Sequence, residues 1–243
     1  MKQGLFATIV IIVALAISIY VYYNLLPDYI VKGGPLVILL LTLSIMVFTY
    51  VFERIFSLRK AQGKGSMTKF LKDVEDSLNN GDIDTAIEAC NKQRGSMANV
   101  IRNGLERYKE VVKDSKIGAE KYMAEVQRAI EEATMLETPL LEKNLIVLST
   151  ISSISTMVGL LGTVIGMIRA FRALAHAGAP DAIQLSVGIS EALINTAGGL
   201  IAAITGIIFY NYFVNKVDNF TYMIDEATSS IVQILNARQM NVK

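Results

Sequence analysis

Glu191 is the residue best placed to do chemistry inside a membrane. It is the only charged residue between Asp181 and Lys216, and the residues around it are mostly apolar. A carboxylate at the centre of a bilayer costs on the order of 3 kcal/mol or more, and desolvation favours its protonated form. Glu191 is therefore either a proton-relay group or a structural carboxyl that bonds a neighbouring helix. A third interpretation places it near the outer membrane surface, where the cost falls.

Hydroxyl, amide and small side chains recur at helical spacing around this acid. One stripe precedes it, at steps of three and four residues: Ser149, Ser152, Thr156, Gly159, Thr163 and Gly166. Two adjacent stripes follow: Glu191, Asn195, Gly198 and Ala202, and Thr196, Gly199, Ala203 and Gly206. Small residues let membrane helices pack closely, and hydroxyls on one helix face could also line a wet path. The candidate proton pathway comprises Thr163, Thr196, Glu191, Thr156, Ser152 and Asn195.

Counting residues from a turn places two of these hydroxyls at one level. The segment His176–Asp181 is rich in turn-forming residues and predicts a tight hairpin between two spans. The midpoint between Thr163 and Thr196 falls at about 179.5, so both lie roughly 24 Å along their helices from the turn at about 1.5 Å per residue. We expect the two threonines to form a polar level in the membrane and to face an oligomer axis.

Four stretches reach the roughly 20 apolar residues that a membrane-spanning helix needs. They are residues 1–27, with an apolar core at Leu5–Leu25; residues 33–53; and the two arms of a hairpin over 144–216, at Asn144–Ile168 and Ala192–Asn215. The first could also be a signal peptide. Its apolar region is too long for one, however, and no A-x-A cleavage site follows, which favours an uncleaved anchor. The fold class expected is an all-α membrane protein with four transmembrane helices.

Charges between the spans set the expected orientation. Arg54, Arg59, Lys60 and Lys64 follow the second span, and such a basic cluster is typical of the cytoplasmic side. Both termini are then cytoplasmic, and Arg169 and Arg172 run against this rule. Residues 54–143 are polar with helical apolar stripes and predict a cytoplasmic helical domain. Residues 217–243 predict a cytoplasmic C-terminal helix.

Three local features of the polar domain carry structural predictions. Asp82 is expected to cap a helix that follows a turn, and Arg94–Ser96 is expected to break the chain. Lys116–Lys143 alternates acidic and basic residues and predicts a long solvent-facing helix. Pro139 either kinks the helix that leads into the third span or marks where that helix starts.

The residue inventory argues against several classes of protein. The net charge is +1, which gives no basic surface for a nucleic acid. A single cysteine, Cys90, excludes an internal disulfide and is expected to be a half-buried helix residue rather than a reactive thiol. A single histidine, His176, would have to build any histidine-based metal site or triad alone. We therefore expect no enzymatic activity, metal or cofactor.

Two segments resemble a known family. Val158–Arg172 contains GLLGTVIGMIRAF, and Leu185–Val214 contains GISEALINTAGGL and ends in YNYFV. Together they closely resemble the MotA/TolQ/ExbB proton channel family, on its ExbB-like branch that serves TonB systems. The resemblance is strong over about 144–216 and weaker over 30–143. It implies that Thr163 and Thr196 match the family's pore threonines and that Glu191 matches its membrane glutamate.

The resemblance also implies partners and a place in the cell. A homo-pentamer in the bacterial inner membrane would enclose single-span ExbD- or TolR-like subunits, whose aspartate would carry protons. Rotation would pass work to a TonB- or TolA-like protein that spans the periplasm. Two departures stand out: Thr205 occupies a position where this branch commonly has proline, and the anchor at Leu5–Leu25 adds to the usual three spans. That anchor is expected to pack on the outside of the ring.

The function expected is therefore an ExbB-like motor subunit that energises a TonB-like protein for outer-membrane transport. A TolQ-like role in envelope maintenance and a role in motility are alternatives within the family. A membrane scaffold that conducts nothing is an alternative outside it. A small-solute transporter is disfavoured because such proteins usually show internal repeats, and this sequence has none.

Overall fold

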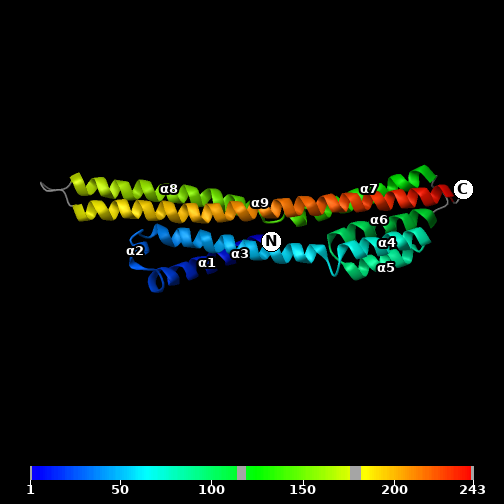
Figure 1. Cartoon of the computed structure of the whole chain (residues 1–243), viewed down its shortest axis with the longest axis horizontal. Coiled ribbons are helices and arrows are strands. Elements are labelled where there is room, and N and C mark those ends of the chain that lie inside the picture. The colour runs from blue at the N-terminus through cyan, green and yellow to red at the C-terminus, as the bar shows by residue number, and fades with distance from the viewer. Residues whose placement is uncertain (1, 114–118, 176–181, 242–243) are drawn as a thin grey trace. The chain divides into compact units, whose positions relative to one another are not determined.

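A computed structural model of the chain describes residues 2–113, 119–175 and 182–241, in which every regular element is a helix (Figure 1). The helices are α1 (Lys2–Asn24), α2 (Asp28–Val31), α3 (Leu36–Gln62), α4 (Met67–Asn80), α5 (Ile83–Gln93), α6 (Ser96–Lys113), α7 (Ala119–Glu142), α8 (Leu145–Ala175) and α9 (Ala182–Asn241). Four helical segments of the described chain are long and apolar enough to cross a membrane. The expected fold class, an all-α membrane protein with four spans, is confirmed.

The chain divides into two compact units. The first comprises Met1–Glu53 and Asn144–Phe213, and the second comprises Arg54–Lys143 and Val214–Lys243. The first unit holds most of the apolar helical sequence, and the second holds the polar, amphipathic helices.

In the first unit, α1 packs through a narrow stripe of small residues. Val10, Ala14 and Ser18 recur at steps of four and are buried. The ring of Phe6 meets that of Tyr50 on α3 edge to face, with 6.2 Å between the centroids. Most other large side chains of α1 are exposed, as expected of a helix that offers its remaining surface to lipid. Helix α1 therefore packs against α3.

Glycines bring α8 and α9 into backbone contact. A Cβ added at Gly166 would lie 2.7 Å from the backbone nitrogen of Ala192. A Cβ at Gly188 would lie 2.7 Å from the nitrogen of Ala170, and one at Gly199 would lie 2.6 Å from a carbonyl oxygen of α8. Small residues permit such an approach, so these stripes serve helix packing. The turn expected at His176–Asp181 lies outside the described residues.

The second unit is built from short amphipathic helices. Gly81, at φ 86°, ends α4 in the left-handed conformation, and the side chain of Asp82 accepts a hydrogen bond from the backbone N–H of Thr85 at 3.0 Å. Asp82 thus caps α5, as the sequence predicted. The expected break at Arg94–Ser96 is also confirmed, because α5 ends at Gln93 and α6 begins at Ser96.

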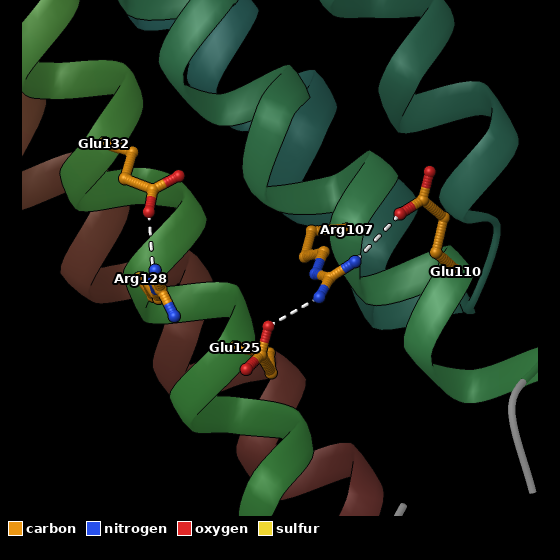
Figure 2. Close-up of polar contacts among 5 residues, drawn as sticks. All are labelled: Arg107, Glu110, Glu125, Arg128 and Glu132. Atoms are coloured by element: carbon orange, nitrogen blue, oxygen red, sulfur yellow. Dashed lines mark hydrogen bonds and ion pairs between the residues drawn. The ribbon is translucent and has the colours of Figure 1, made fainter.

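Apolar and ionic contacts hold α6 against α7. Gly104 on α6 lies so close to Ile130 on α7 that an added Cβ would sit 2.6 Å from that side chain. On the surface, Arg107 on α6 bonds Glu125 on α7 at 2.5 Å and Glu110 on its own helix at 3.2 Å (Figure 2). The long charged helix predicted to begin at Lys116 is described from Ala119, and residues 116–118 lie outside the described ranges.

Arg54 ties α3 to the end of α7. Its side chain is fully buried, with Nη1 donating to the carbonyl oxygen of Lys143 at 2.5 Å and Nη2 donating to that of Leu141. A cation on the last carbonyls of a helix satisfies acceptors that have no partner within it. Pro139 lies within α7 and does not begin the third-span helix, which starts at Leu145 after Asn144 in the left-handed conformation (φ 64°).

The last helix, α9, is continuous over 60 residues from Ala182 to Asn241. It therefore begins ten residues before the fourth span expected at Ala192. The C-terminal helix expected over 217–243 is the same helix continued as far as Asn241, and residues 242–243 lie outside the described ranges. At Thr205 the hydroxyl donates to the carbonyl oxygen of Ile201 at 2.8 Å, and the helix runs through this position.

Candidate functional site

The two threonines expected at one level are in contact. Thr163 on α8 and Thr196 on α9 lie with their Oγ1 atoms 2.5 Å apart, and both side chains are half-buried. The Thr163 hydroxyl also reaches the carbonyl oxygen of Gly159 at 3.2 Å, and that of Thr196 reaches the carbonyl oxygen of Ala192 at 3.1 Å. The common level predicted from residue counting is confirmed. The two hydroxyls are hydrogen-bonded to each other, and either of them can be the donor.

Glu191 is paired with an arginine. It is 3% exposed, and Nη1 of Arg169 on α8 lies 2.6 Å from each of its carboxylate oxygens. Of the three interpretations of Glu191, its contacts match a structural carboxyl bonded to a neighbouring helix.

The turn that precedes α3 contacts this ion pair. Gly34 adopts φ 75°, and a Cβ added there would lie 2.6 Å from Oε1 of Glu191. The carbonyl oxygen of Gly33 accepts a hydrogen bond from Nδ2 of Asn195 at 2.8 Å. Asn195 is fully buried, and its Oδ1 has no partner among the described residues. One carboxylate and one amide of α9 thus bind both α8 and the start of α3.

Ser152 and Thr156 lie further along α8, away from these two clusters. Ser152 is buried and donates to the carbonyl oxygen of Leu148 at 2.8 Å. Thr156 is half-buried and donates to the carbonyl oxygen of Ser152 at 3.3 Å. Such bonds to the preceding turn satisfy a hydroxyl within its own helix. The six predicted site residues therefore fall into a threonine pair, a Glu191–Asn195 cluster and two separate hydroxyls.

Sequence reasoning missed Arg169 and Gly34. Arg169 entered only as an exception to the positive-inside rule. The count from the turn that paired the threonines also places residue 169 level with about residue 190, next to Glu191. That signal was available. No such signal exists for Gly34, because the sequence does not indicate which side chain its turn contacts.

An open apolar groove of about 620 Å³ runs along α8 beside the threonine pair. It is lined by Thr163, Val164, Met167, Ile168, Phe171 and Arg172. Its walls are almost entirely hydrocarbon apart from the hydroxyl of Thr163 and the cation of Arg172. The groove therefore suits an apolar helix or an acyl chain. A helix bound there would contact the hydroxyl of Thr163.

Comparison with known proteins gives the class to which this fold and site belong. Residues 92–226, more than half of the chain, match the MotA/TolQ/ExbB proton channel family. The chain belongs to this family.

Its relatives include proteins of two kinds. It is 38% identical over 109 residues to the biopolymer transport protein ExbB-like 3 of Synechocystis, covering 44% of this chain and 52% of that protein. It is 38% identical over 114 residues to the Tol-Pal system protein TolQ of Pseudomonas aeruginosa, covering 47% and 49%. It is 22% identical over 223 residues to the biopolymer transport protein ExbB of Pseudomonas putida, covering 88% and 64%. The chain spans about half the length of the first two relatives.

Proposed function

We propose that this chain is the channel-forming subunit of an ExbB-like motor, which works with an ExbD-like partner to energise a TonB-like protein for outer-membrane transport. The observation that carries the proposal is the contact between Thr163 and Thr196, in a chain that belongs to a proton channel family. The bacterial inner membrane is the location proposed, with both termini in the cytoplasm. No cofactor other than the transported proton is required.

The proposed channel includes partner chains, because the polar groups of the residues that the structure describes make no complete path. A hydroxyl can pass a proton along a hydrogen bond, but at neutral pH it cannot hold a second proton in addition to its own. Glu191, the acid among the candidate residues, is already paired with Arg169. A second chain that brings its own carboxylate would complete the relay at the threonine pair. We propose a homo-pentamer around one or two single-span subunits, with a partner helix beside the groove on α8.

Glu191 and Asn195 have a different role in this proposal. They bind α8 and the start of α3 to α9, within about one and a half helical turns of Thr196. We propose that they are positioning residues, which fix the spacing of the two threonines. Thr156 and Ser152 extend the hydroxyl face of α8 along the same path.

Proton flux in proteoliposomes tests the proposal. The chain would be reconstituted with the single-span protein that copurifies with it, and a pH-sensitive dye would report flux under an imposed gradient. Thr196→Val keeps the shape and removes the hydroxyl, so we expect flux to fall at least tenfold. Thr205→Val is the matched control, because Thr205 lies on the same helix and bonds only its own backbone among the described residues.

Two results would overturn the assignment. Wild-type flux in Thr196→Val, with the complex still assembled, would remove the threonines from the path. No flux in the wild-type complex under any gradient would favour a non-conducting scaffold. Native mass spectrometry of the same preparations would report the copy number, and five copies are expected.

A TolQ-like role is the second candidate, because a relative of similar identity is a Tol-Pal system protein. The protein that crosslinks to the complex from the periplasmic side distinguishes the two. A TonB-like protein supports the first candidate, and a TolA-like protein supports the second.

A further inference from the structure

A basic cavity in the second unit is not used by the proposed proton path. It has a volume of about 600 Å³ and lies where the end of α3, the break between α5 and α6 and the end of α7 meet. Four cationic residues line it, namely Lys60, Lys64, Arg94 and Lys143, against one acidic residue, Glu137.

The positive charge of this cavity is not neutralised within the described residues. None of the four cationic side chains forms an ion pair there, and the carboxylate of Glu137 accepts a hydrogen bond from Asn99 at 2.9 Å. The first turn of α6, at Ser96, also lines the cavity. A helix N-terminus adds partial positive charge and peptide N–H donors. The cavity therefore suits an anion that carries more than one acceptor oxygen.

Two loops hold two of the cations at the cavity wall. The backbone N–H of Lys64 donates to the carbonyl oxygen of Gln93 at 2.7 Å, and Nε2 of Gln93 donates to the backbone carbonyl oxygen of Gln62 at 3.2 Å. Arg94 has φ 57° and ψ 177°, a conformation that favours glycine. The backbone of Arg94 packs against Gly63, where an added Cβ would overlap the carbonyl oxygen of Arg94, so the loop fixes Arg94 at the cavity wall.

The cavity lies close in sequence to the ends of two membrane spans. Lys60 follows Phe52, the last residue of the apolar stretch in α3, by about two helical turns. Lys143 directly precedes Asn144, where the first unit resumes. The lining also includes Leu140, which is 58% exposed, and Leu141. Charge with adjoining hydrocarbon at the edge of a bilayer is the pattern of an anionic-lipid site.

We propose that this cavity binds the phosphate of an anionic phospholipid headgroup. Lys64 and Arg94 contact the phosphate oxygens, and Leu140 contacts the glycerol and the first acyl carbons. A free phosphate would use the cations but not the exposed leucine, so the lipid is the source that the lining favours.

Lipid titration by native mass spectrometry tests this proposal on the intact complex. The complex would be delipidated in detergent and titrated with phosphatidylglycerol or with phosphatidylcholine of the same acyl chains. Lys64→Gln with Arg94→Gly removes two cations, and Arg94→Gly also relieves the strained backbone, so the variant should fold at least as well as wild type. Lys113→Gln with Lys121→Gln is the control, because these exposed lysines lie away from the cavity.

We expect wild type and control to bind phosphatidylglycerol more tightly than phosphatidylcholine. The cavity variant should lose about tenfold or more of its phosphatidylglycerol affinity, at about a few-fold for each cation removed near a membrane surface. Its melting temperature should not fall. Equal binding of the two lipids by wild type, or equal loss in the cavity variant and the control, would overturn the proposal. Displacement of phosphatidylglycerol by millimolar inorganic phosphate would assign the cavity to a soluble anion and overturn the lipid assignment.

Discussion

One nitrogen of Arg169, Nη1, lies 2.6 Å from both carboxylate oxygens of Glu191 and so joins α8 to α9 by an ion pair. The arginine side chain is 54% exposed and the glutamate side chain 4% exposed. Breaking the pair would therefore leave the glutamate, and not the arginine, buried without a partner charge. Both carboxylate oxygens of Glu191 are thus bonded to α8, whereas the hydroxyls of Thr163 and Thr196 bond each other. The geometry therefore separates the acid that holds the helices from the hydroxyls proposed to conduct.

Removing Arg169 alone should destabilise the protein more than removing both charges. Arg169→Met leaves a buried carboxylate unpaired, and we expect this to cost about 1–3 kcal/mol, because only one partner of the pair is buried. Arg169→Met with Glu191→Gln leaves no unpaired charge, so most of that loss should be recovered. Thermal unfolding of the detergent-solubilised complex measures both variants.

Proton flux in the same variants separates a positioning residue from a proton carrier. If Glu191 positions the helices, the double variant should regain much of the flux lost in Arg169→Met. Flux that stays absent in a double variant whose stability and assembly are restored would identify Glu191 as a carrier and contradict the positioning role.

Gly34 should not tolerate a side chain. Its φ of 75° is unfavourable for alanine, and the added Cβ would lie 2.6 Å from Oε1 of Glu191. We expect Gly34→Ala to lower the free energy of unfolding by about 1–3 kcal/mol and to disturb the Arg169 pair. Gly4→Ala is the matched control, because nothing lies within 4 Å of a Cβ at that position. Equal melting temperatures for the two variants would contradict this account of the turn.

The sequence predicted the features that depend on residue type and on depth in the membrane. It missed the features that depend on which other helix packs against a residue. Charge segregation gave the four spans, and counting from the turn paired Thr163 with Thr196. Arg54 was interpreted as one charge of an orientation cluster, yet it is fully buried against the carbonyls at the end of α7. Cys90 was expected to be half-buried and is buried. In both cases, periodicity gives the helix but not the element that covers it.

Arg54 should be hard to replace, because one planar group reaches two carbonyl oxygens. Arg54→Lys can reach at most one of them well, and we expect a loss of about 2–3 kcal/mol in the free energy of unfolding. Hydrogen exchange should quicken at the end of α7. Arg59→Lys, an exposed position on the same helix, should change neither quantity. Unchanged exchange near Leu141 in Arg54→Lys would show that these bonds do not hold the helix end.

Burial raises the pKa of the Cys90 thiol to about 12. The thiol therefore stays protonated in the folded protein at neutral pH and should resist thiol reagents. A raised pKa for an acid stabilises the folded state below the ordinary value of about 9. That contribution is lost as the pH rises from about 9 toward 12. Maleimide labelling at pH 8 should be slow until the protein unfolds, whereas Ser66→Cys in a Cys90→Ser background should label at once. Rapid native labelling of Cys90 would show that the second unit opens readily.

The ion pair between Arg107 and Glu125 should make the packing of α6 on α7 sensitive to acid (Figure 2). The hydrogen bond from Arg107 lowers the pKa of Glu125 below its ordinary value of about 4.5. A lowered pKa stabilises the folded state above the ordinary value, and this contribution is lost as the pH falls through the folded value. Glu125→Gln should therefore melt at a lower temperature than wild type at pH 7, and the difference should shrink as the pH is taken below 4. Glu132→Gln is the control, because Glu132 pairs with Arg128 on the same helix and does not join α6 to α7. A difference for Glu125→Gln that stayed constant from pH 7 to pH 3 would mean that the side chain acts through its shape rather than its charge.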